Sequence, residues 1–273
     1  MRFTKKNWFV WFVLFDLMLA LIIVNIELPA SSGAAKQQPF SLFDSIGRFF
    51  AGAGAAIEKV TQGTAEAVSG GHSEASHVLI DVPEIRQYPE LPRGCEVTSL
   101  AMLLEQAGVN VSKMELARQV KTEPYYQNGQ FGNPDHGFVG SMTDLSQPGY
   151  GVYHEPLASL ARDYLPYQIV DLSGKPFDAV LERLRAGFPV VVITNVTFKP
   201  LPGNDFRTWK TTSGQVTVTN MEHAVLVTGF DQNHIFFNNP LGGKNESADR
   251  NTFIQAWQQM GSQAISYHKW PFF

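Results

Sequence analysis

The feature that most constrains the fold of this 273-residue chain is a change of hydrophobic period near residue 190. Before it, apolar residues at helical spacing predict helices over residues 95–107, 112–120, 156–164 and 176–186. After it, short apolar runs predict strands over residues 190–194, 224–230, 235–238 and 264–268, and an earlier strand is predicted over 78–82. One more helix is predicted over residues 252–260. Helices and strands that gather in different halves are typical of an α+β fold.

The first 30 residues have a different character. Three positive residues at positions 2–6 precede a 19-residue apolar run, residues 8–26, which Asp16 and Asn25 interrupt. A helix of this length crosses about 30 Å of hydrocarbon, and it exceeds the roughly 7–15 apolar residues of a cleaved signal peptide. We therefore expect a transmembrane anchor with the N-terminus in the cytoplasm and the rest of the chain outside. Cleavage within residues 30–34 would instead give a secreted protein.

The chain is predicted to have three parts. Residues 1–30 form the cytoplasmic N-terminus and anchor, residues 31–78 a stalk, and residues 79–273 a globular domain. The stalk is rich in Ala, Gly, Ser and Gln, and a loose helical stripe in it could lie on the membrane surface or pack on the domain. The net charge of −4 lacks the basic character of nucleic-acid-binding proteins, so no nucleic-acid partner is expected. The oligomeric state is left open.

Cys95 is the one cysteine of the chain, so it has no internal disulfide partner. It stands where a loop of prolines enters the first predicted helix. Unpaired backbone N–H groups and the positive end of the helix dipole at such a position lower the pKa of a thiol. The position is consistent with a nucleophile, and a buried structural cysteine is the alternative.

His223 and Asn239 follow Cys95 by 128 and 144 residues. His223 begins a predicted strand and Asn239 follows the next, so the two would meet at one sheet edge. An imidazole there can act as base and then acid, and an amide oxygen can orient it. This order and spacing are typical of papain-type enzymes. Gln87, eight residues before Cys95, could join the Cys95 backbone N–H in stabilising an oxyanion.

Several segments resemble the motifs of stand-alone bacterial cysteine peptidases similar to the bacteriocin-leader (double-glycine) peptidase domain, within the papain-like superfamily. These are Gln-Tyr-Pro-Glu-Leu-Pro-Arg-Gly-Cys-Glu-Val-Thr-Ser (87–99), Phe-Gly-Asn-Pro-Asp-His-Gly-Phe-Val-Gly (131–140), Gly-Tyr-Gly-Val-Tyr-His (149–154), Glu-His-Ala-Val-Leu-Val-Thr-Gly-Phe-Asp (222–231) and Asn-Pro-Leu (239–241). They occur in family order and cover about residues 79–270.

The resemblance implies a papain-like cysteine peptidase fold, in which a helical half packs on an antiparallel sheet half. It implies Cys95 as nucleophile, His223 as general base and acid, and Gln87 as oxyanion donor. The family commonly has Asp in the third position, which Asn239 occupies here, with Asn238 as the neighbouring alternative.

The substrate cleft is expected to involve a glycine beside the nucleophile and a loop of the middle motif. These residues are Gly94, His136, Gly137, Phe138 and Gly140. The segment 195–220 is expected to be a loop or hairpin that either borders the cleft or faces solvent. Clustered His or Cys ligands for zinc are lacking in the sequence, so neither a metal nor a cofactor is expected.

The predicted activity is hydrolysis of a peptide or exported protein through an acyl-enzyme at Cys95. Two alternatives use the same cleft. One is acyl transfer or amidase action on cell-wall peptides, and the other is a catalytically weak peptide-binding module. Leader-peptidase relatives are fused to a transporter, whereas this chain contains no Gly-x-x-x-x-Gly-Lys-Ser/Thr loop, so cleavage of leaders inside the cell is not expected.

Overall fold

The structure is a computed structural model that describes residues 76–269. The predicted anchor and nearly all of the predicted stalk lie outside these residues. Within the described part of the chain, no helix has the length and apolar character needed to cross a membrane.

The main sheet has seven strands, and every pairing in it is antiparallel. Its strands are β1 (Val78–Leu79), β6 (Ile169–Asp171), β7 (Val190–Asn195), β10 (Glu222–Phe230), β11 (His234–Asn239), β12 (Gly243–Asp249) and β13 (Ala264–Tyr267). Their order is β12-β11-β10-β7-β13-β6, and β1 pairs with β10. The central position of β7 and β10 explains why both read as continuous apolar runs.

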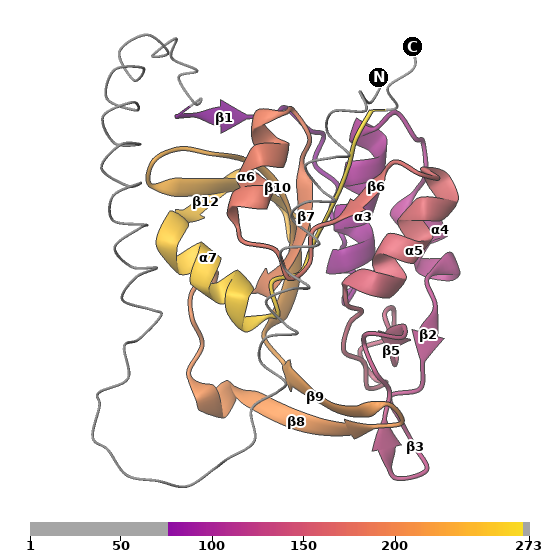
Figure 1. Ribbon diagram of the computed structural model, residues 1–273. Helices are drawn as coiled ribbons and strands as arrows, with labels where there is room; N and C mark the ends of the chain where they lie inside the picture. The colour runs from indigo at the N-terminus through magenta and orange to yellow at the C-terminus, as the bar shows by residue number, and fades with distance from the viewer. Residues whose placement is uncertain (1–75, 270–273) are drawn as a thin grey trace, which may run out of the picture. The chain divides into compact units, whose positions relative to one another are not determined.

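Helices cover both faces of this sheet (Figure 1). They are α3 (Cys95–Gln106), α4 (Lys113–Gln119) and α5 (His154–Tyr164) on one face, and α6 (Asp178–Arg185) and α7 (Arg250–Gln259) on the other. Side chains of β7 alternate between the two layers: Val191 packs with α3, whereas Val190 and Val192 pack with α6 and α7. The sheet is therefore the middle layer of three.

Two smaller sheets lie next to the layer of helices that contains α3, α4 and α5 (Figure 1). One contains β3 (Tyr126–Gln127), β4 (Gln130–Phe131), β8 (Phe206–Thr211) and β9 (Gly214–Thr219), and the 3₁₀ turn η1 (Gly203–Asp205) precedes β8. The other pairs β2 (Thr122–Glu123) with β5 (Phe138–Val139) in parallel. Trp209 of β8 stacks on Phe131 of β4 with ring centroids 4.5 Å apart, which attaches the long hairpin to the loop before α5.

The predicted α+β class is confirmed, and so are the five helices within a few residues of their expected ends. Ser112 caps α4, because its Oγ accepts the Glu115 N–H at 3.1 Å. One expectation needs correction, because the strand expected over 78–82 is two residues long. The sequence also did not predict six strands, β2, β3, β4, β5, β6 and β12, or that α6 and α7 cover the sheet face opposite α3. The segment 195–220 contains the β8–β9 hairpin.

Candidate active site

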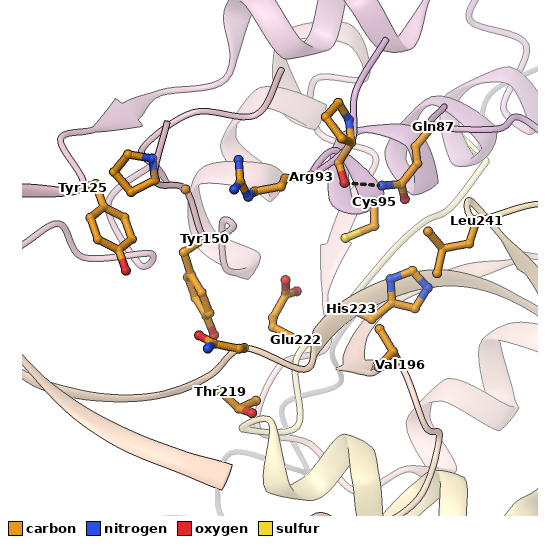
Figure 2. Close-up of a pocket in the computed structure, with 14 residues that line it drawn as sticks. Gln87, Arg93, Cys95, Tyr125, Tyr150, Val196, Thr219, Glu222, His223 and Leu241 are labelled. Atoms are coloured by element: carbon orange, nitrogen blue, oxygen red, sulfur yellow. Dashed lines mark hydrogen bonds between the residues drawn. The ribbon is translucent and has the colours of Figure 1, made fainter. Parts of the chain in front are cut away.

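A cavity of about 450 Å³ lies where the start of α3 faces the start of β10 (Figure 2). Cys95, His223 and Gln87 all line it. Its other lining residues come from the loops around α3 and α5 and from the ends of β7, β9 and β11: Pro92, Arg93, Tyr125, Pro148, Gly149, Tyr150, Val196, Thr219, Asn220, Glu222 and Leu241. The fold thus brings together three predicted site residues that lie more than 130 residues apart at their extremes.

Cys95 is the first residue of α3 and is 6% exposed. Its Sγ lies 3.3 Å from Glu96 Oε2, to which the thiol donates a hydrogen bond. The backbone N–H of Ala224 also faces the sulfur. Because Ala224 follows His223 in β10, this contact places the thiol against the same stretch of strand that holds the imidazole. Figure 2 shows the sulfur and the His223 ring directed into one cavity.

The expected low pKa of Cys95 is not found. Burial raises the pKa of the Cys95 thiol well above its usual range, and the nearby carboxyls of Glu96 and Glu222 raise it further. The Ala224 N–H opposes this effect without reversing it. The prediction was wrong because the helix start favours a thiolate, whereas removal from water and two acidic neighbours, which the sequence pattern did not reveal, favour the thiol.

His223 is 2% exposed and is held by Asn239. The imidazole Nε2 lies 2.9 Å from Asn239 Oδ1, so with Nε2 protonated it donates to that oxygen and the second ring nitrogen, Nδ1, remains for the cavity. Burial lowers the pKa of His223 to about 4, and the bond to Asn239 opposes this shift. Imidazole and thiol are therefore both neutral in the resting site at pH 7.

Glu246 of β12 fixes the direction of the Asn239 amide. Asn239 Nδ2 donates to Glu246 Oε2 at 2.9 Å, while Oδ1 also accepts the Leu241 N–H at 3.1 Å. Gly243 makes room for this carboxylate, since a Cβ at that position would lie 1.7 Å from Glu246 Oε1. Neighbouring Asn238 instead bonds the Val82 carbonyl oxygen and the Asn245 N–H, so its amide has a structural role. Nothing in the sequence motifs pointed to Glu246.

Gln87 is 2% exposed and lies at the cavity wall. Its Nε2 donates to the carbonyl oxygens of Leu91 and Pro92, at 3.2 and 3.0 Å, which stabilises the turn before Cys95. Both amide hydrogens thus have acceptors, and binding an oxyanion would require Gln87 to exchange one of them. The backbone N–H of Cys95 is in the first turn of α3, where N–H groups have no intrahelical acceptor.

The residues expected to bind substrate do not line this cavity. Gly94 packs against Leu91, and a Cβ there would lie 2.6 Å from Leu91 Cβ. Phe138 is 1% exposed and belongs to the core under α3. Gly137 lies against the Lys121 backbone, and His136 lines a separate polar cavity.

Gly140 has an indirect relation to the cavity. It pairs with Gly149, a lining residue, in an isolated β-bridge, and its φ of +80° favours glycine. The middle motif therefore supports the cavity wall, and the lining comes from the next motif through Gly149 and Tyr150. Of the 195–220 segment, Val196, Thr219 and Asn220 reach the cavity.

Two acidic side chains beside Cys95 were not recognised from the sequence. Among the described residues, Sγ of Cys95 and one carboxyl oxygen each of Glu96 and Glu222 form a group within 4.8 Å of one another. Burial raises the pKa of Glu96 to about 7, and burial together with Glu96 raises the pKa of Glu222 well above its usual range. A metal ion requires deprotonated ligands, whereas this group holds protons at neutral pH. We therefore interpret it as a cluster that shares protons. Each acid directly adjoins a predicted catalytic residue in sequence, and that adjacency was the available signal.

Comparison with known proteins finds similar sequences and a similar structure. Residues 79–265 match the Peptidase C39-like family. The uncharacterised protein YvpB of Bacillus subtilis is 47% identical over 182 residues, which is 66% of this chain and 71% of YvpB. A crystal structure from Bacillus anthracis, described as a candidate C39-like peptidase, is similar with a TM-score of 0.70 and 49% identity; the match covers 71% of this chain and 98% of that one.

Proposed function

Since this chain belongs to the Peptidase C39-like family, we propose that it is a cysteine peptidase that hydrolyses peptide bonds through Cys95, His223 and Asn239. The observation that supports this proposal most is the 2.9 Å contact between His223 Nε2 and Asn239 Oδ1 beside a cavity that also holds Cys95. Such a contact selects the tautomer that leaves Nδ1 as the base for the thiol.

The proposed reaction has two stages. His223 Nδ1 takes the thiol proton as Cys95 Sγ attacks the scissile carbonyl carbon, and the amine leaves with that proton, which gives a thioester. Water then attacks the thioester with His223 as base, which releases a carboxylic acid and restores the thiol. The Cys95 backbone N–H and, after exchange of one hydrogen bond, Gln87 Nε2 would stabilise both oxyanions.

Hydrolysis is tested with the full-length chain in detergent and a mixture of peptides in ¹⁸O-labelled water. We expect one ¹⁸O atom in each new carboxyl terminus, and we expect Cys95→Ala and His223→Ala to lower cleavage by at least about a thousandfold. His234→Ala is the matched control, because His234 is exposed and pairs locally with Asp231. Undiminished cleavage by the Cys95→Ala variant would refute the proposal. Products joined to amine acceptors without ¹⁸O would indicate acyl transfer instead, whereas amidase action would introduce ¹⁸O but would release ammonia or an amine from a cell-wall peptide.

One observation favours the alternative of a peptide-binding module. Gln87 Nε2 donates to two backbone carbonyls, which leaves the oxyanion with fewer ready donors. If the protein is a binding module, both the wild type and the Cys95→Ala variant should bind peptides in equilibrium dialysis, and neither should cleave them.

We further propose that the peptidase acts on peptides or exported proteins at the outer face of the cell membrane. The support is the positive residues at positions 2–6 before the apolar run 8–26. Labelling of intact cells with a membrane-impermeant thiol reagent tests the topology, since Cys95 is the single thiol. We expect the reagent to label Cys95 in sealed cells once the proteins on the outer face of the membrane are denatured. Labelling that requires cell lysis would instead indicate that the domain lies inside the cell.

A further inference from the structure

Glu96 and Glu222 approach each other beneath the nucleophile from two different elements. Glu96 is the second residue of α3 and Glu222 is the first of β10. One oxygen of each carboxyl and Cys95 Sγ lie within 4.8 Å of one another. Gly151 closes the group from a third direction, because a Cβ there would lie 2.4 Å from Glu96 Oε1 and 2.9 Å from Glu222 Oε2. The two carboxyls are thus packed together by the fold.

Neither carboxyl has a positive partner in the described part of the chain. Within residues 76–269, no Lys or Arg forms an ion pair with Glu96 or Glu222. Arg93 lines the cavity, yet its Nη1 donates to the carbonyl oxygens of Ser141 and Asp144. Glu96 is 0% exposed and its oxygens accept from the Val152 N–H at 2.7 Å and from the Cys95 thiol at 3.3 Å.

Glu222 is the less satisfied of the two. Its Oε1 is shut off from solvent and has no hydrogen-bond partner among the described residues. A carboxylate with a bare buried oxygen beside a second carboxylate is strongly disfavoured, because both desolvation and like-charge repulsion act on it. A carboxylic acid has no such penalty, which agrees with the raised pKa of Glu222.

Other titratable groups that face the pair stay neutral near pH 7. Burial raises the pKa values of Tyr150 and Tyr153, and it lowers that of His223 to about 4. The thiol of Cys95 is neutral for the reason given above. Glu96, with a pKa of about 7, is therefore the group around the nucleophile whose charge changes in the neutral range.

Building on the proposed function, we propose that Glu96 and Glu222 are positioning residues that keep protons beneath Cys95, and that the peptidase is active while Glu96 is protonated. With Glu96 neutral, the thiol proton can pass to His223 Nδ1 and leave a thiolate beside uncharged neighbours. Once Glu96 ionises, its Oε2 accepts the S–H bond strongly, which holds the proton away from His223 and opposes a negative sulfur. Activity is then lost on the alkaline side through Glu96.

The test compares the pH dependence of kcat/KM for the full-length wild type, Glu96→Gln and Glu222→Gln. The wild type is expected to lose activity with a midpoint near pH 7. In Glu96→Gln the falling limb should move up by at least one pH unit, so that at pH 8.5 it retains roughly tenfold more of its pH 6 activity. Glu222→Gln, which replaces a neutral acid by a neutral amide, should keep the wild-type limb. Glu105→Gln, an exposed acid on the same helix, is the matched control and should not move the limb.

Alkylation of Cys95 by iodoacetamide separates this inference from the peptidase proposal, since it needs no substrate. Glu96→Gln should react roughly tenfold faster than the wild type at pH 8, with near-UV circular dichroism establishing that the variant is folded. Infrared difference spectra between the wild type and Glu222→Gln should contain the carbonyl stretch of a protonated carboxyl at pH 7. Unchanged alkylation in folded Glu96→Gln, superimposable alkaline limbs, or no protonated-carboxyl band would overturn the inference, even if peptides are cleaved.

Discussion

Asn239 donates through Nδ2 to Glu246 Oε2 at 2.9 Å, and this bond, together with the Leu241 N–H that donates to Oδ1, orients Oδ1 towards His223. An amide can rotate by half a turn with little change of shape, so an acceptor on one side is needed to fix the group. The third position of the proposed triad therefore depends on a residue of the next strand, β12, as much as on its own identity.

Asn239→Asp should lower kcat/KM, although the family that the sequence motifs resemble commonly has Asp at this position. The new carboxylate would retain an acceptor for His223, but its second oxygen would meet Glu246 Oε2 in place of the present 2.9 Å hydrogen bond. We expect a loss of roughly tenfold, equivalent to about 1.4 kcal/mol. In the double variant Asn239→Asp/Glu246→Gln, the amide introduced on β12 can donate to the carboxylate, and activity should return to the wild-type level or exceed it. Additive losses in the double variant would contradict this account.

Glu246→Ala should reduce kcat severalfold without unfolding the domain. Its removal leaves Asn239 Nδ2 without its acceptor, and a typical hydrogen bond of this kind contributes about 1 kcal/mol. Glu246→Gln is the conservative control, because its amide oxygen can accept the same bond and should preserve the wild-type rate. Steady-state kinetics and thermal unfolding measure the two effects separately. Loss of the Asn239 amide orientation would lower kcat alone, whereas a loss of stability would lower both kcat and the unfolding temperature.

Gly151→Ala should destabilise the domain by about 1–3 kcal/mol, because the added methyl group overlaps Glu96 and Glu222 in a buried site. Gly203→Ala serves as the control, since nothing lies within 4 Å of a Cβ at that position and a change below about 0.5 kcal/mol is expected. Urea unfolding followed by tryptophan fluorescence measures both. Equal stability of the two variants would mean that the acid pair moves apart at little cost.

His154 and Asp171 form an ion pair with Nδ1 and Oδ2 2.7 Å apart, and it joins α5 to β6. The hydrogen bond to Asp171 raises the pKa of His154. Protonated His154 therefore contributes fully to the free energy of unfolding below about pH 6.5, and this contribution is lost as the pH rises through the pKa of His154 in the folded protein. Despite opposing burial, bonds from His154 and Ser173 lower the pKa of Asp171 to about 2, so its contribution, roughly 2 kcal/mol, is present above about pH 4 and lost as pH falls towards 2.

The contribution of this pair to the free energy of unfolding should therefore be largest between about pH 4 and 6.5. Asp171→Asn should remove that part of the pH dependence, whereas Asp163→Asn, an exposed acid on α5, should leave the profile unchanged. Denaturant unfolding at pH 3, 5.5 and 8 measures it. A wild-type profile that Asp171→Asn does not alter would show that the pair adds nothing.

Local sequence signals were sufficient for the elements that build the site. Helical spacing predicted α3 and its start at Cys95, and continuous apolar runs predicted β7 and β10, because both features reflect burial along a single element. The spacing of Cys95, His223 and Asn239 predicted that they belong together. The sequence could not predict β12, which is polar, so the role of Glu246 remained hidden.

The residues that were expected to bind substrate show what the sequence motifs could not predict, namely which loop residues line the cavity. Phe138 and His136 stand in a motif that resembles a cleft loop, yet the structure buries Phe138 and directs His136 to a different cavity. Which loop residues line a cavity depends on how several loops pack together, and no single segment contains that information.

The sequence by itself determined the fold class, the helix that begins with Cys95 and the strands that hold His223 and Asn239. The tertiary structure decided the chemical environment of the thiol. The start of a helix favours a thiolate, but burial and two carboxyls brought from α3 and β10 favour the neutral form. The reason is that a pKa depends on solvent exposure and on charges across the fold, and both are set only when distant segments meet.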